Sequence, residues 1–282
     1  MNRGIAYDNK GDHDHAITDL DKAIERNPKL DPAYMNRGNA YYKKGDHDRA
    51  VADYDKAIKL NPKYTDAHMN RGIAYYEKGD YDRAIADSDK AIELSPKYAF
   101  AYLNRGNVYS AKGDYNRASA DYDKAIEINP KYALAYLNRG IAYDNKNDHD
   151  RAIADYDKAI EINPKYAHAY MNRGTAHSAK GDHDRAIGDY SKAIELNPKY
   201  ADAYNSRAWA YFKAGKSAQG LPDAEKSLEL RPNEAYALDT RGHIFEALGR
   251  KEEAIADYRL ALSKDPSMET SKEGLKRLGA SP

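Results

Sequence analysis

The sequence contains no cysteine, few phenylalanines and no surplus of charge. The missing cysteines exclude disulfides, thiolate catalysis and cysteine-based zinc sites, although they leave the compartment open. Because 45 Lys+Arg balance 45 Asp+Glu, no global field draws nucleic acid or an anionic membrane to the chain. No apolar run could span a bilayer, and no signal-peptide pattern follows Met1. We therefore expect a cytoplasmic protein with neither a membrane nor a nucleic-acid partner.

Motifs of enzymes and cofactor sites are also missing. The sequence has no Walker loop, no HExxH, no GxSxG and no paired acid and base beyond solvated charges. His13-Asp14-His15 resembles a metal cluster, but residues two apart on a helix do not face the same way. We therefore predict that the protein is not an enzyme and has no cofactor and no metal site.

What the chain does have is a long repeat, best seen from Ala33 to Tyr64. The same stretch returns every 34 residues, lightly edited, from Ala67, Ala101, Ala135, Ala169, Ala203 and Ala237. A fixed period of this size indicates a stack of similar supersecondary units. Small Ala beside 26 Tyr suits helices that pack closely with phenol groups reaching the edge.

Each repeat contains two helical patterns. The first runs from about Ala33 to Lys44 and ends at Gly45, which can adopt the left-handed conformation that closes a helix. The second runs from about Asp48 to Leu60, with Asp46 as its N-cap, and ends at Asn61-Pro62. The unit is a helical hairpin, which cannot bury its apolar face alone but can do so in a stack.

These residues resemble the tetratricopeptide repeat. Counting positions from Asp31, the family pattern at positions 4, 8, 11, 20, 24, 27 and 32 is met by Tyr34, Gly38, Tyr41, Ala50, Tyr54, Ala57 and Pro62. The resemblance implies an all-α, right-handed superhelical α-solenoid of eight units whose concave groove binds peptides. The predicted units are 1–30, 31–64, 65–98, 99–132, 133–166, 167–200, 201–234 and 235–268, in one solenoid over 1–270.

The two ends of the solenoid depart from the pattern. Residues 271–282 are predicted to form a C-terminal capping helix, over 271–278, and a tail. The seventh unit carries Gly220 and Pro222 inside its second helix, so we expect a late start or a kink there. The chain begins inside a first helix, so we expect residues 1–8 to be frayed or to pack on another molecule.

One arc of the first helix, formed by positions 2, 5, 6, 9, 12 and 13, corresponds to the groove of the family. Position 6 carries a row of asparagines, similar to the asparagine ladder of O-GlcNAc transferases, and position 5 carries an apolar row. The groove residues predicted to bind a peptide are Asn36, Asn70, Asn104, Asn138 and Asn172, with Met35, Met69, Leu103, Leu137 and Met171, and Tyr42 and Tyr76. The asparagines can pair with a peptide backbone and the apolar row can take its side chains. Alternatively, both rows are inherited solvent-side residues.

The groove lacks the cations of the carboxylate clamp known in chaperone adaptors of this family, because position 5 is never Lys. The family's usual Leu at position 7 is instead an Arg that points toward the second helix, and position 23 is always Asp. We predict a structural Arg–Asp ladder, because a half-buried guanidinium needs a carboxylate; phosphate capture is the alternative. Its members in the central units are Arg37, Arg71, Arg105, Arg139 and Arg173, with Asp53, Asp87, Asp121, Asp155 and Asp189.

The leading hypothesis is a protein–protein interaction scaffold that binds a partner peptide or helix in the concave groove. The alternative is a structural scaffold that self-assembles through the ends or sides of the solenoid. The truncated first repeat, 1–30, is a possible contact between copies. A third class is a regulatory fragment of a larger enzyme. The sequence does not name the partner.

Overall fold

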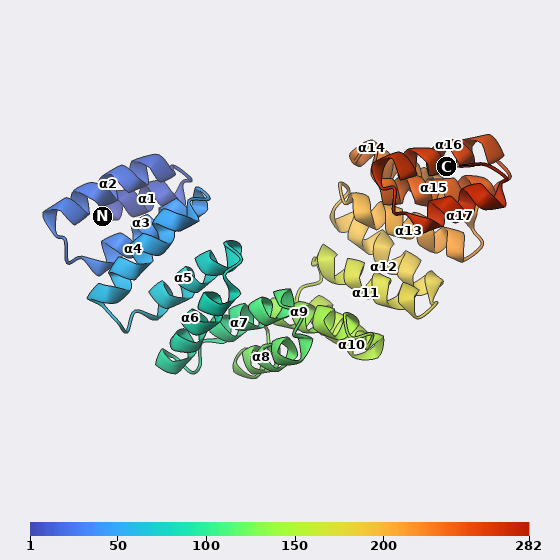
Figure 1. Ribbon diagram of the computed structural model, residues 1–282. Helices are drawn as coiled ribbons and strands as arrows, with labels where there is room; N and C mark the ends of the chain where they lie inside the picture. Colours follow the sequence, from blue (N-terminus) through green and yellow to red (C-terminus); the bar gives the residue numbers. More distant parts are fainter. Residues whose placement is uncertain (282) are drawn as a thin grey trace. The chain divides into compact units, whose positions relative to one another are not determined.

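The computed structural model describes residues 1–281, and all regular structure in that range is α-helical (Figure 1). Consecutive helices are joined by short turns and pair as hairpins. The helices are α1 (Asn2–Asn9), α2 (His13–Arg26), α3 (Asp31–Lys43), α4 (His47–Leu60), α5 (Thr65–Glu77), α6 (Tyr81–Leu94), α7 (Ala99–Ala111), α8 (Tyr115–Ile128), α9 (Ala133–Asp144), α10 (His149–Ile162), α11 (Ala167–Ala179), α12 (His183–Leu196), α13 (Ala201–Lys213), α14 (Ser217–Leu230), α15 (Ala235–Ala247), α16 (Lys251–Lys264) and α17 (Glu269–Arg277).

The turn inside each hairpin follows from its sequence. Gly45 ends α3 with a φ of +78°, and Asn147 takes the same role in a later repeat with a φ of +58°. Asp46 then caps α4, because its side chain accepts a hydrogen bond from the backbone N–H of Arg49 at 3.1 Å. The predicted helix bounds agree with α3 and α4 to within two residues.

The two helices of a hairpin touch where glycine and alanine leave room for tyrosine. A Cβ on Gly38 would lie 2.7 Å from a ring carbon of Tyr54, so only glycine fits opposite this ring. Tyr54 is 1% exposed, and Ala50 and Ala57 are fully buried beside it. The repeated Ala and Tyr positions therefore form the core of the hairpins that carry tyrosine, with Tyr54, Tyr122, Tyr156, Tyr190 and Tyr258 all buried.

The chain divides into two compact units, Met1–Ala142 and Tyr143–Pro282. In the N-terminal unit, α3 contacts α4 and α5, and α5 contacts α6 and α7. In the C-terminal unit, α11 contacts α12 and α13, and α13 contacts α14 and α15. This neighbour-to-neighbour packing defines an all-α helical repeat solenoid. A single solenoid over 1–270 stays a prediction.

In the C-terminal unit, α14 begins at Ser217, in register with the second helices of the other repeats, and continues through Pro222. The predicted late start is therefore wrong, and the kink that we gave as its alternative stays a prediction. Packing outweighs the helix-breaking residues here: Ala224 is fully buried in a cluster with Ala208 and Ile244. Gly220 makes the close approach possible, because a Cβ there would lie 2.8 Å from the carbonyl oxygen of Ala208.

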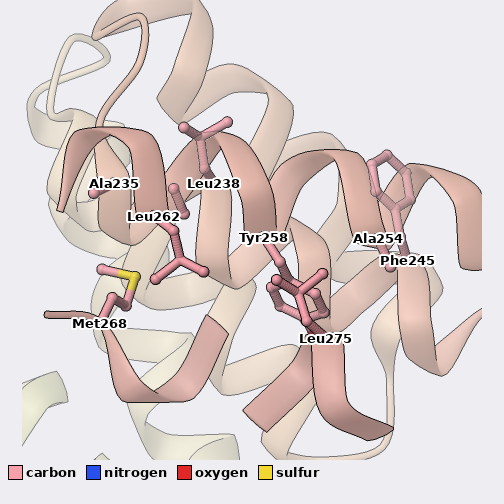
Figure 2. Close-up of a cluster of buried hydrophobic side chains, with 9 residues drawn as sticks. Ala235, Leu238, Phe245, Ala254, Tyr258, Leu262, Met268 and Leu275 are labelled. Carbon is pink, nitrogen blue, oxygen red and sulfur yellow. The ribbon is translucent and has the colours of Figure 1, made fainter. Parts of the chain in front are cut away.

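The helix α17 packs against the last hairpin. Leu275 is fully buried beside Tyr258, in a cluster that also contains Met268 (Figure 2). Gly274 lets α17 approach Tyr258, since a Cβ there would lie 2.4 Å from a ring carbon. The apolar face of the last hairpin is thus buried by a short amphipathic helix.

Polar contacts fix α17 in the same place. Ser271 donates from its hydroxyl to Asp239 at 2.5 Å, and both side chains are buried. Arg277 forms a two-pronged ion pair with Glu246, with both N–O distances at 2.8 Å. This pair lowers the pKa of Glu246, because its hydrogen bonds favour the ionised carboxylate.

Candidate peptide-binding face

The arginine at position 7 pairs with the aspartate at position 23 of its own repeat. Arg105 donates from Nε and Nη2 to the two carboxylate oxygens of Asp121, at 2.9 and 2.6 Å. Such a fork-to-fork contact fixes the geometry of both side chains. The same contact joins Arg3 to Asp19, Arg37 to Asp53, Arg71 to Asp87, Arg173 to Asp189, Arg207 to Asp223 and Arg241 to Asp257.

The remaining guanidinium nitrogen of Arg105, Nη1, donates to an aspartate of the preceding repeat. Arg105 donates from Nη1 to Asp89 at 2.5 Å, and Arg139 makes the equivalent contact with Asp123. Asp155, the position-23 aspartate of the same repeat as Arg139, is 5% exposed. The sequence analysis did not predict this second set of carboxylates. The sequence does contain the signal, because position 25 is aspartate in the first five repeats, as Asp21, Asp55, Asp89, Asp123 and Asp157. The Arg–Asp ladder therefore ties neighbouring repeats together. All three guanidinium nitrogens of Arg37, Arg71, Arg105 and Arg173 donate to carboxylates, which disfavours phosphate capture.

Burial limits what the ladder adds to stability. Asp53 is 6% exposed, and this burial raises the pKa of its carboxyl, against the opposing effect of Arg37. The cost of desolvating the carboxylate thus offsets much of the attraction within the pair. We interpret the ladder as a device that sets the register between repeats.

The apolar row at position 5 is not part of the groove surface. Met69 is fully buried and packs with Ala91 of its own second helix and Ala101 of the next repeat. The prediction that this row receives peptide side chains is wrong for Met35, Met69, Leu103 and Leu137, which are all 5% exposed or less. Met171 is half-buried against a similar cluster. Position 5 points between repeats, where it fills the core.

The asparagines at position 6 adopt two different arrangements. Asn70 donates from its side-chain Nδ2 to the side-chain oxygen Oδ1 of Asn39 in the preceding repeat at 2.8 Å. The hydroxyl of Tyr54 donates to the same Oδ1 at 2.9 Å. Asn138 and Tyr122 make the equivalent contacts with Asn107, both at 2.9 Å. We call Asn39–Asn70 and Asn107–Asn138 the two carboxamide pairs.

The other asparagines of the row turn back onto their own helix. Asn36, Asn104 and Asn172 donate to the carbonyl oxygens of Pro32, Phe100 and His168, at 2.6, 2.9 and 2.9 Å. The cause lies at position 9 of the preceding repeat. This position supplies a side-chain oxygen as acceptor only where it is asparagine. Along the N-terminal unit that position alternates as Ile5, Asn39, Ile73, Asn107 and Ile141.

Three recesses open along this face of the N-terminal unit. The first recess, of about 270 Å³, is lined by Asn39, Tyr42, Lys43, Tyr54, Asn70 and Ile73. The second recess, of about 140 Å³, is lined by Gly72, Ile73, Tyr76, Glu77, Ser88, Asn104, Asn107 and Val108. The third recess, of about 250 Å³, is lined by Tyr76, Asn107, Ser110, Ala111, Tyr122, Asn138 and Ile141.

The first and third recesses are equivalent, shifted by two repeats, and each contains one carboxamide pair. Of the predicted groove residues, Tyr42, Tyr76, Asn70, Asn104 and Asn138 line these recesses, whereas Asn36 and Asn172 line none of the three. Sequence reasoning missed Asn39 and Asn107. The signal that could have found them is the two-repeat alternation of asparagine and isoleucine at position 9.

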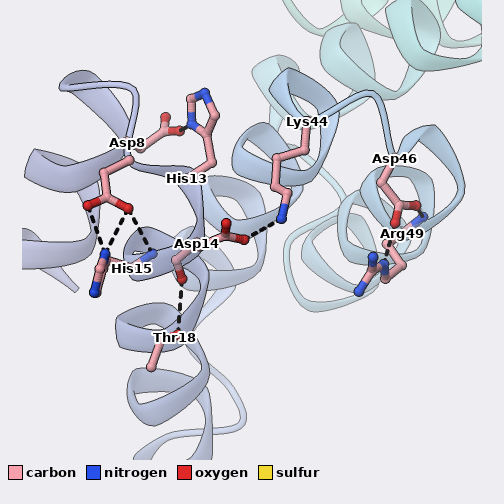
Figure 3. Close-up of polar contacts among 9 residues, drawn as sticks. Asp8, His13, Asp14, His15, Thr18, Lys44, Asp46 and Arg49 are labelled. Carbon is pink, nitrogen blue, oxygen red and sulfur yellow. Dashed lines mark hydrogen bonds and ion pairs between the residues drawn. The ribbon is translucent and has the colours of Figure 1, made fainter.

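The histidines near the N-terminus contact different aspartates. His13 bonds Asp8 at 2.7 Å, and His15 bonds its own helix cap Asp12 at 2.8 Å, while Asp14 pairs with Lys44 of the next repeat (Figure 3). Within residues 1–281, no cluster of three or more His, Asp or Glu side chains could hold a metal ion. In that same range no helix is long and apolar enough to cross a bilayer.

The geometry defines a helical-hairpin repeat protein with a polar recessed face. Sequence profiles of the TPR repeat match residues 4–45, 38–79, 74–113 and 106–146, and profiles of the tetratricopeptide repeat match 133–166, 167–200, 190–221 and 235–268. The chain belongs to the tetratricopeptide repeat family. Proteins of this family are generally non-enzymatic scaffolds that bind protein or peptide partners.

Several solved structures resemble this chain. A tetratricopeptide repeat protein from Parabacteroides merdae ATCC 43184 is 25% identical, with 88% of this chain and 98% of that chain covered and a TM-score of 0.66. MamA is 33% identical, with 58% and 96% covered and a TM-score of 0.53. YrrB, described as a TPR protein with an unusual peptide-binding site, is 26% identical, with 67% and 97% covered and a TM-score of 0.53. No curated protein matches the chain.

Proposed function

We propose that the protein is an interaction scaffold whose N-terminal unit binds an extended peptide segment of a partner along the three recesses. The observation that carries the proposal is that each carboxamide pair has, within the described part of the chain, two side-chain groups without a partner, one amide nitrogen and one amide oxygen. Among the described residues, nothing accepts from Nδ2 of Asn39 or donates to Oδ1 of Asn70. The same holds for Nδ2 of Asn107 and Oδ1 of Asn138.

Each carboxamide pair offers one donor and one acceptor at an open recess, which are the groups that a peptide backbone can pair with. The inter-repeat hydrogen bond and the tyrosine hydroxyl hold both amides in place, so little side-chain freedom is lost on binding. This mode would be tolerant of the bound sequence. The peptide-binding site named for YrrB, a structural relative, supports the same kind of ligand.

The proposal is tested with peptides selected from a displayed random 12-residue library on the full-length chain. The double variant Asn39→Ile/Asn107→Ile places at position 9 the residue that alternate repeats already carry there, so the fold should be kept. Loss of the paired amides at two recesses should weaken the selected peptides about tenfold or more.

The matched control is Asn36→Ala/Asn172→Ala, which removes two asparagines of the same row that line none of the three recesses. It should leave the dissociation constants unchanged. Equal affinities for the wild type and the Asn39→Ile/Asn107→Ile variant, or a failure to enrich any peptide, would contradict the proposal.

A further inference from the structure

The second recess differs from its neighbours in its floor. Tyr54 and Tyr122 line the first and third recesses, but the equivalent residue of the second recess is Ser88. Ser88 is 2% exposed and donates its hydroxyl to the carbonyl oxygen of Ala84 at 2.9 Å. The second recess therefore has a small hydroxyl side chain where the first and third recesses have a phenol ring.

Besides the unused amide donor of Asn107, the second recess offers two acceptors, the side-chain oxygens of Asn104 and Glu77. The amide of Asn104 is engaged with Phe100, which leaves its carbonyl oxygen to face a ligand. Glu77 lies at the same recess, is exposed, and forms no ion pair among the described residues. Burial raises the pKa of Tyr42 and Tyr76, and the charge of Glu77 adds to both rises, after that of Tyr81 in the case of Tyr76.

The cations nearest in sequence already have partners. Lys43, which lines the first recess, bonds Asp8 at 2.7 Å. Lys78 pairs with Asp48, and Lys112 donates to Asp82 at 2.6 Å. Arg71 and Arg105 are held in the Arg–Asp ladder. The carboxylate of Glu77 is therefore the uncompensated charge of this recess.

We propose that the second recess takes a lysine or arginine side chain of the bound peptide, an inference that rests on the proposed function. Ile73 and Val108 provide apolar contact for the aliphatic stem, and the ring of Tyr76 can face the cation. Glu77 pairs with the charged group, and the oxygen of Asn104 accepts from it. The flanking carboxamide pairs hold the backbone on either side.

The test uses peptides selected on the wild-type chain from the same displayed library. They should share one basic residue, and replacing it with glutamine should weaken binding about tenfold. Glu77→Gln should weaken the parent peptides by a similar factor and leave the glutamine peptides unchanged. The matched control, Glu127→Gln, removes an exposed carboxylate of a second helix that pairs with Lys124, and should change neither affinity.

A second variant tests the shape of the recess. Ser88→Tyr places there the residue that most repeats carry, so folding should be retained, and the ring should fill the recess and abolish the preference for a basic residue. Peptides that depend on the carboxamide pairs but carry no shared basic residue, or that bind Glu77→Gln unchanged, would overturn this inference and leave the proposed function standing. If no selected peptide depends on the carboxamide pairs, both fail.

Discussion

At the scale of single residues, the Arg–Asp ladder separates structure from binding. Replacing Arg105 with methionine removes the partner of Asp121, which is 5% exposed, and leaves a buried carboxylate unpaired. We expect the free energy of unfolding to fall by about 1–3 kcal/mol. Chemical denaturation of the variant measures this loss.

The control for this prediction is Arg117→Met, which breaks the exposed pair between Arg117 and the helix cap Asp114. An exposed pair contributes about 0–1 kcal/mol, so this variant should be close to the wild type. Equal losses in the two variants would show that the ladder has no special structural role.

The sequence predicts the ladder and the asparagine row, but not which neighbours of the row are exposed. Positions 5 and 6 are adjacent on the helix and fall in the same predicted arc, yet Met69 is fully buried and Asn70 lines a recess. The next repeat decides this difference, because it covers position 5 and leaves position 6 open. Helical periodicity locates a face to within about a third of a turn and carries no information on that covering.

At the scale of elements, two glycines inside second helices should respond in opposite ways to alanine. Gly188 in α12 has no atom within 4 Å of an added Cβ, so Gly188→Ala should stabilise the protein by up to about 1 kcal/mol. Gly220 in α14 would place its Cβ 2.8 Å from the backbone of Ala208, so Gly220→Ala should destabilise it by about 1–3 kcal/mol. Thermal unfolding of both variants checks the signs, and a shift in the same direction would contradict this account of α14.

The docking of α17 should depend on pH through Glu246. Arg277 lowers the pKa of Glu246 in the folded state, so the stabilisation is present above its ordinary value of 4.5 and is lost as the pH falls through the lowered pKa. Glu246→Gln should therefore show a smaller drop in unfolding temperature between neutral and acidic pH than the wild type. Glu269→Gln, which removes an exposed pair on the same helix, should keep the wild-type pH dependence. Identical curves for Glu246→Gln and the wild type would rule out this role.

The elements themselves were largely predictable, and the exception is instructive. Caps, glycines and prolines recur at fixed offsets, so the bounds of α3 and α4 follow from local rules. The start of α14 does not, because Pro222 and Gly220 argue locally against a helix that tertiary packing stabilises. Intrinsic helix propensity does not predict the bounds of a helix that packs between buried neighbours, because tertiary packing outweighs it.

At the scale of the whole molecule, each repeat depends on contacts with its neighbours, and the chain carries no net charge. Specificity in such a protein arises from local differences between repeats. In the N-terminal unit the differences are the alternation of asparagine and isoleucine at position 9 and the Ser88 and Glu77 substitutions. A pattern search at a 34-residue period averages these differences away, which is why the repeat was evident and the recesses were not.

The central claim is that the unused amides of Asn39 and Asn107 contact the bound peptide. The most direct measurement is an NMR titration that follows the side-chain amide signals of the asparagines as a library-selected peptide is added to the full-length chain. The account predicts that the Nδ2 signals of Asn39 and Asn107 shift in a saturable way while those of Asn36 and Asn172 stay in place. Saturable binding that leaves the Asn39 and Asn107 signals unmoved would contradict it.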